Sequence, residues 1–91
     1  MSKMFLITFD FKGSADKYSK VFETLKSFGT WWHYMENTWL VMSEKAPSEM
    51  NDLMRPHYDK DINVLIIEVG KNRSGWLPQK AWDWIKKYNP K

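Results

Sequence analysis

Apolar and polar residues alternate along the first ordered stretch of the chain, which reads MFLITFDF over positions 4–11. One face of this stretch carries only phenylalanine and isoleucine, whereas the other combines Met4, Leu6 and Thr8 with Asp10. A period of two with both faces partly apolar predicts a strand that is covered on both sides. Because a buried unpaired carboxylate is costly, we expect Asp10 to lie at the wet end of the strand, to have a partner, or to take part in chemistry.

The rest of the chain alternates between helical and strand-like patterns. Caps, glycines and prolines mark where each pattern begins or ends. The patterns predict a first helix that starts at Ser14 and ends before Gly29, followed by two strands in 30–43 around a turn at Glu36 and Asn37. They next predict a helix in 46–59, with Ser48 as its N-cap and Pro56 near its end. A strand in 62–70 and a helix in 76–88 complete the chain.

The predicted order is βαββαβ followed by one more helix, which is typical of an α+β, ferredoxin-like fold with a C-terminal addition. Such a fold has a four-stranded antiparallel sheet in the order four, one, three, two, with both core helices on one face. Asp10 would then point to the opposite, helix-free face. We expect Glu36, Asp59 and Asp61 at the same rim, so that four carboxylates gather there.

Length and composition restrict the class of protein. The 91 residues suffice for one small domain, 1–91. The chain has no cysteine, which excludes disulfides and thiolate metal sites and favours a cytoplasmic setting. Its longest apolar runs are far shorter than the roughly 20 residues that cross a bilayer, so we expect no membrane partner.

Charge and aromatic content point to the kind of partner. The net charge is +3, with 14 basic and 11 acidic residues, which weakly favours RNA, DNA or nucleotides. Six tryptophans, five phenylalanines and four tyrosines supply more aromatic surface than one small monomer is expected to bury. We therefore expect a homodimer interface or a stacking surface.

Two groups of residues are candidates for binding nucleic acid. The first is Trp31, Trp32 and Trp39, which could form a platform on which bases stack. The second is Lys71 and Arg73 in the loop GKNRSG, which could contact phosphates.

Strand alternation limits how many residues of the first group can lie on one exposed face. It sends Trp31, His33 and Met35 to one face and Trp32 and Tyr34 to the other, so about half of the set belongs to a core or an interface. Three further tryptophans, at 76, 82 and 84, are expected to seal the C-terminal helix against the sheet or a second subunit.

Three segments carry a resemblance to known families. LITFDF, WWHYMENTWLV and GWLPQKAWDWI resemble a group of small bacterial and phage proteins labelled SinR-like. The strand ending in TFDF and the element order also resemble CRISPR-associated protein two and its relatives such as VapD. That resemblance implies that Asp10 lies near a dimer two-fold, where two copies could bind Mg²⁺ or Mn²⁺ and hydrolyse phosphodiesters. Those relatives usually end in an extra strand, whereas this chain ends in a tryptophan-rich helix.

Three functions remain open from the sequence. The first is a dimeric binding module for nucleic acid or nucleotides. The second is a divalent-metal phosphodiesterase with Asp10 as catalytic residue and metal ligand. The third is a regulatory module that binds another protein and has no nucleotide ligand. We favour the first, because no nucleophile constellation is present and a shared fold does not establish an activity.

Overall fold

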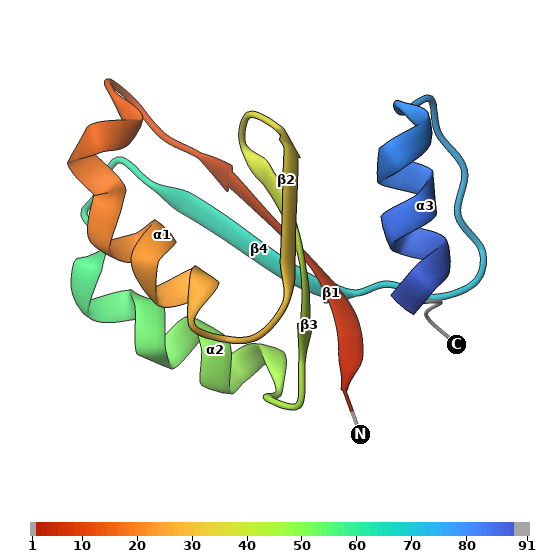
Figure 1. Cartoon of the computed structure of the whole chain (residues 1–91). Coiled ribbons are helices and arrows are strands. Elements are labelled where there is room, and N and C mark those ends of the chain that lie inside the picture. The colour runs from red at the N-terminus through yellow and green to blue at the C-terminus, as the bar shows by residue number, and fades with distance from the viewer. Residues whose placement is uncertain (1, 89–91) are drawn as a thin grey trace.

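A computed structural model describes residues 2–88 and shows one antiparallel sheet with helices on both faces (Figure 1). The predicted α+β class, the four-stranded sheet and the added C-terminal helix are confirmed. The elements in chain order are β1 (Lys3–Asp10), a 3₁₀ turn (Ala15–Tyr18), α1 (Ser19–Lys26), β2 (Trp31–Met35), β3 (Thr38–Ser43), α2 (Pro47–Met54), a second 3₁₀ turn (Arg55–His57), β4 (Asn63–Glu68) and α3 (Gln79–Tyr88).

The strands lie in the order β2-β3-β1-β4, so that β1 is central and β2 and β4 form the edges. Read from the β4 edge, this order is four, one, three, two. Ile7 shows the register, because it lies opposite Trp39 on β3 and opposite Ile66 on β4. All neighbouring strands are antiparallel. Because the backbone of each strand is pleated, successive side chains of β1 point to opposite faces of the sheet and contact different layers of the molecule.

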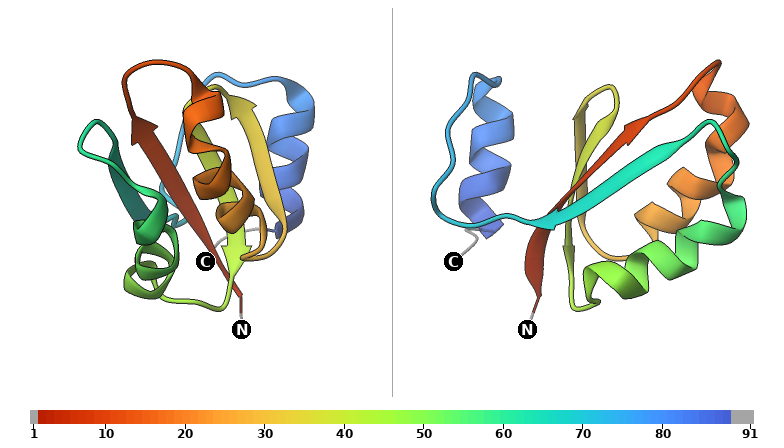
Figure 2. Two further views of the ribbon diagram at one scale, coloured as in Figure 1. Left: turned by 90° about the vertical axis from the view of Figure 1, so that its left-hand side faces the viewer. Right: turned by 180° about the vertical axis from the view of Figure 1, so that it is seen from behind.

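The first face of the sheet is covered by α1 and α2, which lie side by side on it (Figures 1 and 2). Phe5, Ile7 and Phe9 of β1 are buried there. The alternation in the sequence predicted that these residues of β1 share one apolar face. The remaining buried members of this first core are Tyr18, Val21, Leu25, Phe28, Trp39, Val41, Met50, Met54 and Ile62.

The second face of the sheet is not free of helices, which corrects our expectation. In both views α3 lies on the side opposite α1 and α2 (Figure 2). Trp82 and Trp84 of α3 pack against the sheet, as predicted for these two tryptophans. Within residues 2–88, no helix combines the length and apolar character that a membrane span requires. The second core contains Met4, Leu6, Trp32, Leu40, Met42, Val69, Leu77, Ala81, Ile85 and Tyr88 besides these tryptophans.

The C-terminal helix covers only part of the second face. Leu65 and Ile67 of the edge strand β4 point to this face, opposite Thr8 and Leu6, yet they remain 55% and 47% exposed. The open half of the second face is therefore apolar and lies along an unpaired sheet edge.

The starts of the first two helices follow the local sequence with two differences from the prediction. Ser14 caps the first helical segment as expected, since its Oγ accepts the Asp16 N–H, but that segment begins as a 3₁₀ turn. The N-cap of α2 is Ala46 and not Ser48, because Pro47 takes the first helical position, where its missing N–H costs nothing. Pro56 lies in the 3₁₀ turn that follows α2, as its inability to continue a helix predicts.

Gly29 closes the gap between α1 and the hairpin. A Cβ at this position would collide with the carbonyl oxygen of Met42. The close approach lets Met42 N–H donate to the Thr30 carbonyl at 2.8 Å, which starts the pairing of β2 with β3. A glycine is therefore required here by packing, and α1 ends earlier than predicted, at Lys26.

Candidate functional site

Asp10 ends β1 and lies opposite Asn63 of β4. Its side chain is exposed, and no residue in 2–88 forms a hydrogen bond or ion pair with its carboxylate. Asp10 borders a shallow hollow of about 220 Å³ that also touches Thr8 and Leu65. The strand-end carboxylate is thus at the wet end of β1, as one of our alternatives predicted, and its role in metal binding or catalysis stays a prediction.

The other three predicted carboxylates do not join Asp10 in a metal site. Asp59 Oδ2 is 2.9 Å from Lys17 Nζ, and its Oδ1 accepts hydrogen bonds from the Tyr18 hydroxyl and the Asp61 N–H, each at 2.9 Å. Asp61 lies 3.6 Å from the same ammonium. Nowhere in residues 2–88 do three or more acidic or histidine side chains form a group that could hold a metal ion. The turn at Glu36 and the loop of Asp59 and Asp61 both adjoin the end of β1, as expected, because the Phe9 N–H donates to the Asn37 carbonyl at 2.9 Å and Asp10 lies opposite Asn63. Within residues 2–88 these carboxylates nevertheless form no metal site, and Lys17 pairs with two of them.

This ion pair shifts two pKa values. The Lys17 ammonium is the main reason that the pKa of Asp59 falls to about 2. The Asp59 carboxylate in turn raises the pKa of Lys17. A carboxylate held in its charged form by a lysine stabilises the loop before β4 and is not poised for acid–base chemistry.

The aromatic strand pair is mostly interior, which corrects its predicted role as a stacking platform. Trp39 is 3% exposed in the first core, and Trp32 is 4% exposed in the second. Of the three predicted tryptophans, Trp31 alone is exposed, at 40%, with Lys26 Nζ 5.1 Å from its ring centroid. His33 stacks on Trp39 at 3.6 Å and donates from Nε2 to the Glu36 carbonyl, so it has a structural role.

A bulge in β2 breaks the predicted alternation. Trp32 lies opposite Leu40, but Met35 lies opposite Thr38, so three steps along β2 match two along β3. An extra residue reverses which face the following side chains point to. Met35 therefore lines the same hollow as Trp32 and Thr38, and not the face of Trp31 as predicted.

The C-terminal segment 70–88 carries the positive charge of the protein. It has five basic residues and one acidic residue, a net charge of +4, whereas residues 2–69 have eight basic and ten acidic residues, a net charge of −2. Lys71 and Arg73 lie in the loop before α3 and are exposed. Lys80 of α3 lies 5.1 Å from the ring centroid of Tyr34. The basic loop that we predicted is thus part of a larger basic surface.

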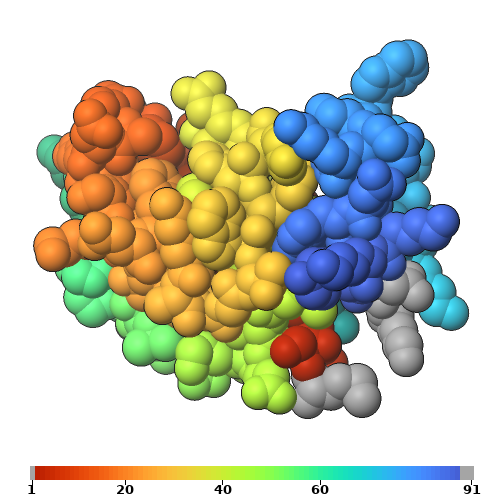
Figure 3. All heavy atoms as spheres, in the orientation of Figure 1, coloured from red at the N-terminus to blue at the C-terminus, as the bar shows by residue number. Residues whose placement is uncertain are grey.

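A groove of about 320 Å³ lies between this segment and the second face of the sheet. The space-filling view shows α3 packed against β2 (Figure 3). Arg73, Ser74 and Thr38 are the polar side chains at the groove, and the other side chains around it are apolar. The apolar lining residues are Leu6, Trp32, Met35, Leu40, Val69, Trp76, Leu77, Trp82 and Ile85.

Trp76 lies at the groove and does not pack on the sheet. We expected it to seal α3 against the sheet or a second subunit, and the first alternative is wrong, because Trp76 is 99% exposed whereas its neighbour Leu77 packs into the second core. Contact with a second subunit stays a prediction. The charge difference between segments 2–69 and 70–88 was a signal in the sequence that could have directed attention to this loop.

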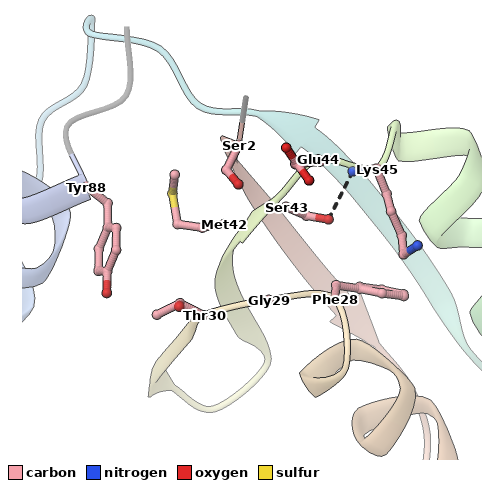
Figure 4. A pocket seen from close by; sticks show the side chains of 9 residues that line it. All are labelled: Ser2, Phe28, Gly29, Thr30, Met42, Ser43, Glu44, Lys45 and Tyr88. Atoms are coloured by element: carbon pink, nitrogen blue, oxygen red, sulfur yellow. Dashed lines mark hydrogen bonds between the residues drawn. The ribbon is translucent and has the colours of Figure 1, made fainter.

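A second hollow, of about 370 Å³, lies at the far end of the sheet near Tyr88 (Figure 4). Its polar groups are engaged within the fold. Ser43 Oγ accepts the Lys45 N–H at 3.1 Å, and Lys45 Nζ is 3.6 Å from Glu49. The groove beside Trp76 is the better candidate site, because it combines an exposed aromatic ring with a guanidinium that has no carboxylate partner within residues 2–88.

Comparison with known proteins does not assign this chain to a family, since no family model and no curated protein matches it. The resemblance to SinR-like proteins, VapD and CRISPR-associated protein two therefore stays a prediction.

We expect Asp59→Asn to destabilise the protein in a pH-dependent way. The pKa of Asp59 in the folded protein, about 2, lies below the ordinary value of 3.8, so its stabilising effect is present above about pH 4 and is lost as the pH falls towards 2. Urea denaturation should give a lower midpoint for the variant at pH 7 and converging midpoints at acidic pH. Glu23→Gln, which removes an exposed carboxylate from α1, is the control. A difference that does not change with pH would show that the charge of Asp59 is not what stabilises the loop.

Proposed function

We propose that this chain is a ferredoxin-like module that binds single-stranded nucleic acid or nucleotides through its C-terminal segment. The observation that carries this proposal is the fully exposed Trp76 beside Arg73 at an apolar groove, within a segment of net charge +4. The element order and the antiparallel sheet support the fold assignment.

Two physical interactions would act together at this surface. Basic side chains attract phosphates and release counterions, which makes binding sensitive to salt. Exposed aromatic rings stack on bases without reading their sequence. Lys71 and Arg73 remain the predicted phosphate contacts, and Trp76 takes the stacking role that buried Trp32 and Trp39 cannot have. Trp31 stays a secondary stacking candidate on the other side of β2.

The open edge of the sheet supports a homodimer. Leu65 and Ile67 expose apolar side chains next to each other on β4, whose outer backbone groups have no neighbouring strand within residues 2–88. A second copy that covers these residues would remove them from water and satisfy the edge.

The same edge supports the second candidate function, a phosphodiesterase dependent on Mg²⁺ or Mn²⁺. Asp10 borders the same hollow as Leu65, so pairing of two copies there would bring two unpartnered carboxylates close to the interface. Hard cations prefer several oxygen ligands, and one Asp10 alone supplies too few.

Nucleic-acid binding should weaken with salt, and the basic loop should account for part of that dependence. We expect Lys71→Ala combined with Arg73→Ala to lower the log–log salt slope for a single-stranded oligonucleotide by about 1 to 2 without changing the fold. Tryptophan fluorescence titration over a range of salt concentrations measures this slope. Lys12→Ala with Lys20→Ala removes two exposed charges on the α1 side and should leave the slope nearly unchanged. No response to any RNA, DNA or nucleotide at low salt would instead favour the protein-binding alternative.

The dimer should form through β4. Light scattering is expected to give about twice the chain mass of 11.0 kDa, and Leu65→Lys is expected to give the monomer, because a charge at an apolar interface must be desolvated. Leu53→Lys is the matched control, since Leu53 is an exposed leucine, at 46%, on α2. A wild-type mass near that of one chain at tens of micromolar would contradict the dimer and the paired Asp10 site together.

The catalytic alternative has its own test. We expect the wild type to bind oligonucleotides with little or no cleavage in the presence of Mg²⁺ or Mn²⁺, because the ligand set is sparse. The phosphodiesterase would be the correct function if the wild type cleaves robustly with metal, Asp10→Asn abolishes the cleavage and Asp83→Asn leaves it intact. The dimer mass of each variant shows whether the change acts on chemistry or on assembly.

A further inference from the structure

The groove beside Trp76 has the size and chemistry of a site for one planar ring. Its volume of about 320 Å³ lies at the lower end of the range for ligand pockets, and most of its lining is apolar. Leu40 and Ile85, from opposite sides of the groove, are only 6% and 5% exposed. Trp82 and Leu77 come from α3 and the loop before it. A small flat group can therefore enter between the sheet and the C-terminal segment.

Trp76 is held at the groove by its neighbours while its own ring packs on nothing. A Cβ at Gly75 would lie 3.8 Å from the Trp82 ring, and Leu77 belongs to the second core, so the backbone on both sides is close to α3. The indole between them is 99% exposed. An exposed indole on a stretch of chain that is anchored on both sides is available to stack on a ligand in the groove.

Arg73 supplies a cation at the same groove. Its Nη1 donates a hydrogen bond to the Gly70 carbonyl at 2.9 Å, which fixes the guanidinium to the loop 70–73 beside the groove. No carboxylate in residues 2–88 pairs with it. The remaining N–H donors suit a bidentate anion such as a phosphate.

The lining of the groove favours a flat ring that is joined to an anion. Trp32, which is 4% exposed, and Leu40 supply apolar surface to one wall. A flat ring can pack on such a wall, and the guanidinium of Arg73 can bind an anion attached to the ring. A base joined to a phosphate matches both features.

We propose that the groove takes one unpaired base of a single strand, with Trp76 stacked on the base and Arg73 on the adjacent phosphate. This proposal rests on the proposed function and adds how the strand is held. A base in a duplex is stacked and paired, so it cannot enter the groove without being extruded. The site therefore selects single strands over duplexes, and it accepts RNA or DNA unless the sugar is contacted.

The test compares oligonucleotides that differ in one property at a time: the sugar, the presence of bases, or base pairing. A ten-nucleotide oligodeoxyuridine, the oligouridine of the same length, an abasic ten-nucleotide strand and a ten-base-pair duplex are titrated into the wild-type protein. We expect the two intact single strands to bind about 10-fold to 100-fold more tightly than the abasic strand and the duplex, which is the range that stacking of one base supplies. A ribose contact would appear as a difference between the uridine and deoxyuridine strands.

Variants locate the stacked ring. Trp76→Ala should lower affinity for the intact single strands by the same 10-fold to 100-fold and leave the abasic strand unaffected, with an unchanged thermal midpoint because Trp76 packs on nothing. Trp31→Ala removes the secondary stacking candidate on the first face of β2 and should lower affinity less than Trp76→Ala does. Leu53→Ala is the control that should retain full binding, since it removes an exposed apolar side chain from α2, which has no proposed binding role.

The outcomes separate this proposal from the function on which it rests. The base site is wrong, but the nucleic-acid function holds, if binding depends on salt, is equal for intact and abasic strands, and does not change in Trp76→Ala. Loss of affinity in Trp31→Ala but not in Trp76→Ala also overturns it. Failure of every strand to bind at low salt overturns both proposals.

Discussion

The structure depends on the burial of both faces of β1. This central strand lies between β3 and β4, and its alternate side chains enter two separate cores. Ile7 contributes to the core under α1 and α2, and Met4 contributes to the core under α3. Fully burying such a side chain stabilises a protein by roughly 1.5–3 kcal/mol, so both layers are needed by a chain of this length. The two helical layers therefore meet through one strand.

The candidate site follows from the unequal coverage of the two faces. Two helices cover the first face, whereas α3 alone lies on the second and leaves its β4 side open. Where α3 and its preceding loop cross the sheet, a groove forms that neither could make alone. Where they do not reach, Leu65 and Ile67 remain exposed at the edge. The groove and the open edge are thus consequences of one short helix on a wide face.

Charge is separated along the chain in a way that suits this geometry. The segment 70–88 is basic, and residues 2–69 are slightly acidic. The Asp59 carboxylate is paired with Lys17 and accepts a hydrogen bond from Tyr18. The Asp10 carboxylate, at the end of the central strand, has no such partner within residues 2–88. The proposed phosphate-binding surface on the α3 side and Asp10 at the β4 edge are therefore separate surfaces of the molecule.

The sequence by itself determined the element order, the antiparallel strands and the two-sided burial of β1, because period-two and helical patterns are local and extend over whole elements. It also determined that the loop with Lys71 and Arg73 is exposed. Tertiary structure decided which tryptophans are accessible. A single bulge in β2 reverses the face of Met35, and close packing buries Trp32 and Trp39 on opposite sides of the sheet. Trp76 stays exposed whereas Trp82 packs on the second core, because exposure depends on where the loop crosses the sheet. That crossing is set by contacts between residues far apart in the chain.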